Sequence, residues 1–235
     1  MSEPLKTNME AREIMVDAVE TMAWTGEVPW HGLGVEIGAD DPALRDMPAF
    51  MEKAGLDWEV QKVSLMYGDD HPFTPGQYIE NEFHLIRSND GAQLSVHPVT
   101  DDGYNVRDNA SAVDVLQPFL DSGEFTLETA GSLFSGRKVW FLCRLGTGFD
   151  VGHEDQVVNF LTYTIDHSGI NANTAFYTPI RVVCANTLRL ATSSAGDMVR
   201  DNHRTPFDAD LMRVALDLVR KQSVDYETLC KDMMA

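Results

Sequence analysis

Apolar positions near the start of the chain recur at the three- and four-residue spacing of a helix face. The pattern over residues 8–23 predicts an amphipathic helix, which would form an N-terminal unit of residues 1–26. The next segment, 27–34, mixes proline and glycine with an aromatic residue and therefore predicts a loop. We expect Trp30, the aromatic residue of this loop, to pack into the core.

Capping residues mark two further helices. A short helix is predicted over 47–54, because Asp46 can cap its N-terminus and Gly55 can end it. An apolar face over 108–122 predicts a longer helix in the middle of the chain.

Runs of β-branched and aromatic residues, bounded by turn residues, predict a series of strands. The runs cover 57–66, 78–87, 92–96, 124–131, 138–145, 156–166 and 174–183. Because they follow one another at short intervals, we expect a mostly antiparallel sheet of about six strands. With flanking and C-terminal helices, this is an α+β fold.

The end of the chain returns to a helical pattern. Helices are predicted to begin at Thr205, which has a proline after it, and at Ser223. We therefore divide the chain into the N-terminal helix, an α+β core over 27–191 and a C-terminal helical segment over 192–235.

The charge of the chain limits what it can bind. The net charge of −19, from 37 acidic and 18 basic side chains, disfavours a surface that binds nucleic acid throughout, since phosphate binding depends on lysine and arginine. The stretch 179–235 differs, because it carries eight acidic and eight basic residues. An anion-binding surface is expected there, unless its arginines merely pair with nearby aspartates on exposed helices.

Cysteine content and hydropathy indicate a cytoplasmic protein. Cys143, Cys184 and Cys230 are widely spaced and lie in apolar or helical contexts, as buried reduced thiols do. No signal peptide is recognisable, and no apolar run is long enough to span a bilayer. We expect no membrane association.

Sequence motifs for metal, phosphate or nucleophilic chemistry are lacking. The seven histidines show no metal-binding spacing, and three Asp-Asp pairs fall in predicted turns. The segment 131–138 resembles a phosphate loop, but Arg137 replaces the lysine and a strand follows, so a hairpin connection is expected. We expect no metal and no cofactor, assign no catalytic residue, and lean towards a protein that is not an enzyme.

Polar residues interrupt the apolar pattern in two neighbouring segments. The turn 166–173 contains His167 and Asn171, and the apolar run 178–188 contains Arg181 and Asn186. Buried polar groups need partners, so these residues form either a structural network or a ligand-binding cluster around His167. The ligand-binding candidates are His167, Asn171, Arg181, Asn186 and Arg189. We expect the first half of 178–188 to be a strand that carries Arg181 towards the core, and the second half to turn into a helix.

Five blocks of sequence resemble a known family. They are Trp30-His-Gly-Leu-Gly34, Ala54-Gly-Leu-Asp-Trp-Glu-Val60, Thr129-Ala-Gly-Ser-Leu133, Gly136-Arg-Lys-Val-Trp140 and Thr178-Pro-Ile-Arg-Val-Val-Cys-Ala-Asn-Thr-Leu188. In this order they are similar to the phage- and plasmid-borne proteins of the DUF932 family. The resemblance implies a genomic context and a role near DNA replication or recombination, but no catalytic residue.

Three functional hypotheses remain open. The first is a non-enzymatic protein of phage or plasmid DNA metabolism that binds or anneals single-stranded DNA through the C-terminal quarter, with stacking aromatics and cations. The second is an acidic protein that binds a host protein, as an inhibitor or a DNA mimic. The third is an enzyme on a small or nucleotide substrate, using His167, Arg181 and Asn186. A homo-oligomer is compatible with each.

Overall fold

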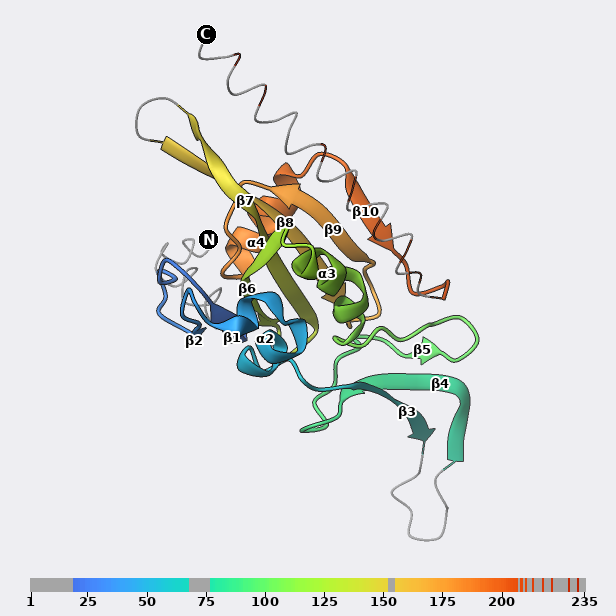
Figure 1. Ribbon diagram of the computed structural model, residues 1–235. Coiled ribbons are helices and arrows are strands. Elements are labelled where there is room, and N and C mark those ends of the chain that lie inside the picture. The colour runs from blue at the N-terminus through green and yellow to red at the C-terminus, as the bar shows by residue number, and fades with distance from the viewer. Residues whose placement is uncertain are drawn as a thin grey trace, which may run out of the picture.

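The computed structural model describes residues 19–67, 77–151 and 155–206, and isolated positions beyond these. The described chain contains a large sheet and a smaller one, with helices packed on the large sheet (Figure 1). The predicted α+β class and the mostly antiparallel sheet are therefore confirmed. In spatial order the large sheet consists of β10 (Met198–Asp201), β9 (Asn173–Thr178), β8 (Asp155–Asp166), β7 (Lys138–Val151), β6 (Phe125–Leu133), β1 (Val19–Trp24) and β2 (Val35–Glu36).

Strands β6 to β9 form an antiparallel meander, which is the arrangement that short turns between apolar runs favour. Of the strands described, only β1 and β2, at one edge of the sheet, pair in parallel. The smaller sheet has the order β3 (Val60–Tyr67), β4 (Gln77–Arg87) and β5 (Val99–Thr100).

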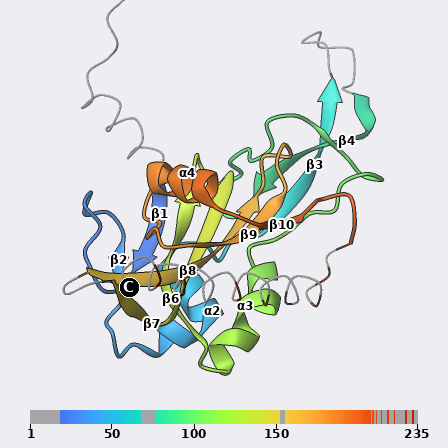
Figure 2. The same cartoon turned by 90° about the horizontal axis from the view of Figure 1, so that it is seen from above.

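Both faces of the large sheet are covered, which explains why successive residues of strands such as β6 and β9 are buried, instead of every second residue. On one face lie α2 (Met47–Lys53) and α3 (Ser111–Asp121), and on the other lies α4 (Ala185–Ser194), as Figure 2 shows. Two separate apolar cores result. The first contains Phe50, Leu116, Phe141 and Tyr163, and the second contains Trp140, Phe160, Phe176 and Leu188.

The predicted α2 is confirmed with its end signals. The Asp46 side chain accepts a hydrogen bond from the main-chain N–H of Ala49, and Gly55 adopts a φ of 67° just after the helix. Helix α3 begins at Ser111, three residues later than predicted, and Ala110 at its N-cap provides no side-chain hydrogen bond.

Four predictions near the ends of elements are wrong. Residues 19–24 form β1, because the free edge of β6 provides backbone partners that outweigh the helical spacing. Residues 8–18 of the predicted helix lie outside the described part. Trp30 is 59% exposed and does not fill the core. The strand before Arg181 ends at Thr178, and residues 92–96 contribute only one isolated bridge to β4.

The segment 192–235 does not begin as a purely helical unit. Strand β10 lies within it and adds an edge to the large sheet by pairing with β9. Beyond Pro206 the described positions that carry helical structure are Asp210, Arg213, Asp217, Lys221, Thr228 and Asp232; the rest of the predicted C-terminal helices lies outside the described residues. Among the residues described, no helix is long and apolar enough to cross a membrane.

Candidate functional site

A pocket of about 370 Å³ lies where the two sheets meet. Its wall comes from three segments that are far apart in the sequence: the loop around β5, the turn between β8 and β9, and the residues after β10. The lining residues are Pro98, Val99, Thr100, Gly103, Tyr104, Gly169, Ile170, Asn171, Ala172, Asn202, His203 and Arg204. We call this the β5–β10 pocket.

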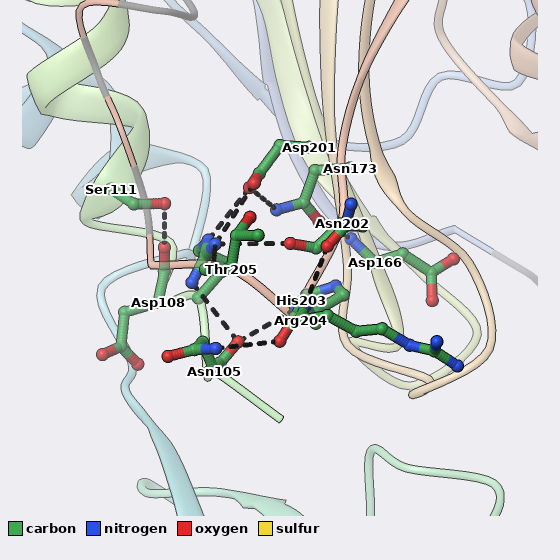
Figure 3. Close-up of polar contacts among 11 residues, drawn as sticks. Asn105, Asp108, Ser111, Asp166, Asn173, Asp201, Asn202, His203, Arg204 and Thr205 are labelled. Atoms are coloured by element: carbon green, nitrogen blue, oxygen red, sulfur yellow. Dashed lines mark hydrogen bonds and ion pairs between the residues drawn. The ribbon is translucent and has the colours of Figure 1, made fainter. Parts of the chain in front are cut away.

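A buried ion pair holds the segment after β10 in place (Figure 3). Arg107 donates from Nε to Oδ2 of Asp201 at 2.9 Å and from Nη2 to Oδ1 at 3.1 Å, and its side chain is only 3% exposed. Nη2 also donates to the carbonyl oxygen of Thr205 at 2.7 Å. The guanidinium group therefore fixes both ends of the stretch that contributes Asn202, His203 and Arg204 to the pocket.

A chain of hydrogen bonds connects this ion pair to the turn between β8 and β9. The Asn173 amide donates to Asp201 Oδ2 at 3.1 Å, and its oxygen accepts from the main-chain N–H of Asp166 at 2.9 Å. Asp166 in turn accepts from Asn171 Nδ2 at 3.1 Å and from both the N–H and the hydroxyl of Ser168. These satisfied polar groups make the floor of the pocket rigid.

Tyr104 and His203 form a stacked pair in the wall, with ring centroids 4.6 Å apart and planes inclined by 8°. His203 Nδ1 lies 3.2 Å from the carbonyl oxygen of Asn105, so Nδ1 carries the proton and Nε2 has a free lone pair. Burial lowers the pKa of His203, which keeps the ring neutral, and burial raises the pKa of Tyr104. Both His203 Nε2 and the Tyr104 hydroxyl are buried without a hydrogen-bond partner in the described structure.

Gly169 shapes the turn that closes the pocket. Its φ is +77°, a left-handed conformation that side chains disfavour, and a Cβ there would lie 3.2 Å from Val99 Cγ1. The turn is also tied to the loop before β5, because the main-chain N–H of Val96 donates to the carbonyl of Ser168 at 2.8 Å.

Replacing Gly169 by alanine should destabilise the protein by about 1 kcal/mol, from left-handed strain and the contact with Val99. Gly196→Ala is the matched control, because Gly196 has no positive φ and no heavy atom lies within 4 Å of the position that a Cβ would take there. Urea unfolding of the two variants measures the difference. Equal midpoints for both variants would show that the turn is not constrained in this way.

His167 lies behind the pocket and has a structural environment. Its Nε2–H donates to Oδ1 of Asn109 at 2.9 Å, and the Asn109 amide donates to the carbonyl of Leu56 at 3.0 Å. Its ring also meets Trp58 edge-on, with centroids 5.3 Å apart. Burial lowers the pKa of His167 to about 3, so the side chain is neutral. The structural alternative is therefore favoured for His167, whereas Asn171 lines the pocket directly.

The remaining candidates lie at the other end of the large sheet. Thr164 pairs with Thr174 and Phe160 with Thr178, so residues just after Asp166 and residues just after Thr178 are separated by the length of the β8–β9 ladder. At about 3.3 Å per residue this is roughly 20 Å. The cluster of His167 with Arg181 that the sequence allowed is therefore not formed.

Arg181 serves as a structural connector. Its Nε donates to Oε1 of buried Glu128 at 2.6 Å, and Nη1 and Nη2 donate to the carbonyl oxygens of Glu27 and Thr25, each at 2.6 Å. Glu128 also binds Arg144 at 3.1 Å. With its donors engaged, Arg181 ties the 25–27 segment to β6, which is the network role that the sequence left open.

The segment around Arg181 also joins several of the resembling blocks. The hydroxyl of Thr129 donates to the carbonyl of Val182 at 2.6 Å, and His31 Nε2 donates to that of Val183 at 3.0 Å. Cys184 is buried at the N-cap of α4, as predicted. Asn186 and Arg189 lie on the first turns of this helix, half-buried and exposed respectively, and their ligand role stays a prediction.

Several residues that line or support the pocket were missed by sequence reasoning. Tyr104, Arg107 and His203 occur in segments whose pattern indicates loops, and no local spacing connects residue 104 to residue 203. The one signal was the opposite charge of Arg107 and Asp201, but the sequence alone cannot show that these two residues form a pair. Within the described residues, no group of three or more histidine, cysteine or acidic side chains could hold a metal ion.

The family model for DUF932, a domain of unknown function, matches residues 96–235, more than half of the chain. The chain belongs to this family. All residues that line the β5–β10 pocket lie within the matched range. No curated protein and no solved structure matches the chain.

Proposed function

We propose that the protein is a non-enzymatic protein of DNA metabolism, which binds single-stranded DNA by taking one nucleotide into the β5–β10 pocket. The observation that carries the proposal is the charge of the lining. In a chain with a net charge of −19, none of the twelve lining residues is acidic, and Arg204 is an exposed cation among them. A phosphate group meets no carboxylate in this lining.

The acidic residues next to the pocket already have partners: Asp166 and Asp201 are bonded in its floor, as described above, and Asp101 and Asp102 are bonded beside β5. Lys62 Nζ donates to Asp101 Oδ1 at 2.8 Å, and Asn81 Nδ2 donates to Asp102 Oδ1 at 2.9 Å. The charge of Asp101 is thus partly balanced by Lys62, which reduces the repulsion that a phosphate would meet at the entrance, whereas Asp102 keeps its charge and accepts a neutral amide donor.

The rest of the lining suits a base. Val99 and Ile170, the latter 58% exposed, provide an apolar surface against which a base can pack. The side chains of Asn171 and Asn202 provide amide donors and acceptors of the kind that bind base edges. The volume lies in the range of about 300–1,000 Å³ usual for small-molecule sites and holds one nucleotide rather than several.

Charge reversal at the pocket should weaken binding of single-stranded DNA. With a fluorescein-labelled oligothymidine at low salt, Arg204→Glu is expected to reduce the affinity measured by fluorescence anisotropy about tenfold, because a phosphate contact becomes a repulsion. Arg189→Glu is the matched control, since it makes the same charge change on exposed α4 at the other end of the sheet.

The outcomes separate the site from the function. If the oligonucleotide binds and only Arg189→Glu weakens it, DNA binding stands but the pocket is not its site. If the unmodified protein does not bind at micromolar concentration in low salt, single-stranded DNA is not the ligand.

A second candidate is an acidic protein that binds a basic partner protein. It is favoured by the net charge and by four exposed apolar residues in the loop after β1 and at the start of β2, Val28, Trp30, Leu33 and Val35. Such a protein would bind a lysine-rich peptide, and salt would weaken this binding. The Trp30→Ala variant would lose the binding, whereas the Arg204→Glu variant would bind the peptide like the unmodified protein. Equal binding of the peptide by the unmodified chain and by Trp30→Ala would argue against it.

A further inference from the structure

Among the strands that the structure describes, β3 is an edge strand with one side unpaired. In the smaller sheet β4 lies between β3 and β5, and β3 lies on the outer side of β4 in Figure 1. The ladder between β3 and β4 is regular from Val60, opposite Arg87, to Ser64, opposite Phe83. An edge of this kind presents main-chain N–H and C=O groups that another strand can bind.

Hydrogen bonds at the start of β3 fix which residues face the free side. The carbonyl of Glu59 accepts from the main-chain N–H of Ser88, so residue 59 faces β4. The N–H of Val60 instead donates to the Asp108 side chain at 2.6 Å, outside the ladder. Because main-chain groups alternate in an antiparallel strand, those of Lys62 and Ser64 also point to the free side, and those of Val63 point to β4.

Strand β3 keeps only part of the usual protection of an edge strand. The Asp108 carboxylate binds the N–H of Val60, and the ladder with β4 shifts register between Ser64 and Met66, but the described structure shows neither device at 62–64. Residues 60–67 contain no proline and no acidic residue, although the chain has 37 acidic side chains. The one charged residue, Lys62, is turned across the sheet: its Nζ binds Asp101 at 2.8 Å and the carbonyl of Tyr104 at 3.1 Å, and lies over the ring of Phe83. On the opposite face, Val63 is 43% exposed.

We propose that the free edge of β3 pairs with the β3 of a second copy of this chain, antiparallel about a twofold axis at Val63. In this register Lys62 lies opposite Ser64 of the other copy, and both present their free main-chain groups, as a hydrogen-bonded pair requires. Val63 lies opposite Val63 of the other copy, and cross-strand pairs of β-branched residues stabilise sheets.

Charge selects this register and this partner. An axis at Lys62 would place two lysines opposite each other, whereas an axis at Val63 places no two like charges opposite each other within 60–66. Elsewhere the high negative charge of the chain opposes self-association, but 60–67 contains no acidic residue, and the Asp108 carboxylate reaches this edge at Val60, three residues before the proposed axis. The two smaller sheets would then form one continuous sheet of six strands, with three from each copy.

A cysteine at the axis tests the register. In a non-hydrogen-bonded antiparallel pair the Cα atoms are about 4.5 Å apart, within the range of a disulfide. In a chain that also carries Cys230→Ser, Val63→Cys is expected to become largely disulfide-linked on mild oxidation. Gln61→Cys is the control, since two such residues would be about 13 Å apart in this register. Cys143 and Cys184 are buried and remain in both variants.

A proline at the free edge tests the pairing itself. Ser64→Pro removes an N–H that faces away from β4, so it should leave the monomer folded and abolish dimers in sedimentation velocity. Ser64→Ala, which keeps the N–H, should dimerise like the unmodified protein. The proposal is overturned if the unmodified chain is monomeric at every concentration, if Gln61→Cys crosslinks as well as Val63→Cys, or if Ser64→Pro dimerises like Ser64→Ala.

Discussion

Replacing Arg107 by alanine is expected to lower the free energy of unfolding by roughly 3–5 kcal/mol, because it leaves the carboxylate of Asp201 buried without its partner. The Arg107 and Asp201 side chains are only 3% and 9% exposed, so water cannot substitute for the lost bonds. In a chain of this size the melting temperature should fall by about 10 °C. The carbonyl of Thr205 also loses its donor, so the variant should bind the oligonucleotide poorly even below its melting temperature.

The matched control is Lys53→Ala. Lys53 also forms an ion pair, with Asp41 at 3.2 Å, but the two side chains are 40% and 28% exposed. Its loss should cost at most about 1 kcal/mol. Equal melting temperatures for the two variants would mean that the Arg107–Asp201 pair does not hold the segment after β10.

Acid is expected to destabilise the fold well above the pH at which carboxylates titrate. His167 has its pKa lowered from 6.5 to about 3 by burial, and the pKa of His203 is lowered for the same reason. Above pH 6.5 both histidines are neutral in the folded and in the unfolded chain, so they do not reduce the free energy of unfolding. As the pH falls below 6.5 the unfolded chain takes up protons that the folded chain does not, and stability falls by up to about 1.4 kcal/mol per pH unit for each histidine.

The window from pH 6.5 to about 4 isolates this effect. Asp41, Asp90 and Asp102 have pKa values lowered from 3.8 in the folded chain. Their contribution to the free energy of unfolding is therefore lost mainly as the pH falls below 3.8. His167→Gln keeps a donor for Asn109 and cannot titrate, so the slope of unfolding free energy against pH in this window should decrease by about 1.4 kcal/mol per unit. An unchanged slope in urea titrations at several pH values would show that His167 is not held neutral.

Local signals in the sequence predict much of the fold. Apolar runs with turn residues between them identify β6 to β9, and the Asp46 and Gly55 signals identify α2. The error at residues 19–24 has a physical origin, since Val19, Met22 and Ala23 satisfy a helical spacing as well as a strand. The choice between the two depends on the partner β6, which begins more than a hundred residues later.

The candidate site is less predictable, because it depends on three-dimensional proximity. The turn 166–173 is recognisably polar in the sequence, and its Asn171 does line the pocket. Arg181 stands out as a polar residue in need of partners, but its partner Glu128 lies in another strand. The long β8–β9 ladder then separates Arg181 from His167, which no periodicity indicates.

The most direct test of the central claim is the response of two isoleucine methyl groups to single-stranded DNA. Ile170 lines the β5–β10 pocket, whereas Ile180 packs against the core near α4 at the other end of the sheet. On titration of the methyl-labelled protein with oligothymidine, a base held against Ile170 should shift its δ-methyl resonance through the ring current and leave that of Ile180 unchanged. An Ile170 resonance that stays in place at saturation, or a shift confined to Ile180, would contradict the account.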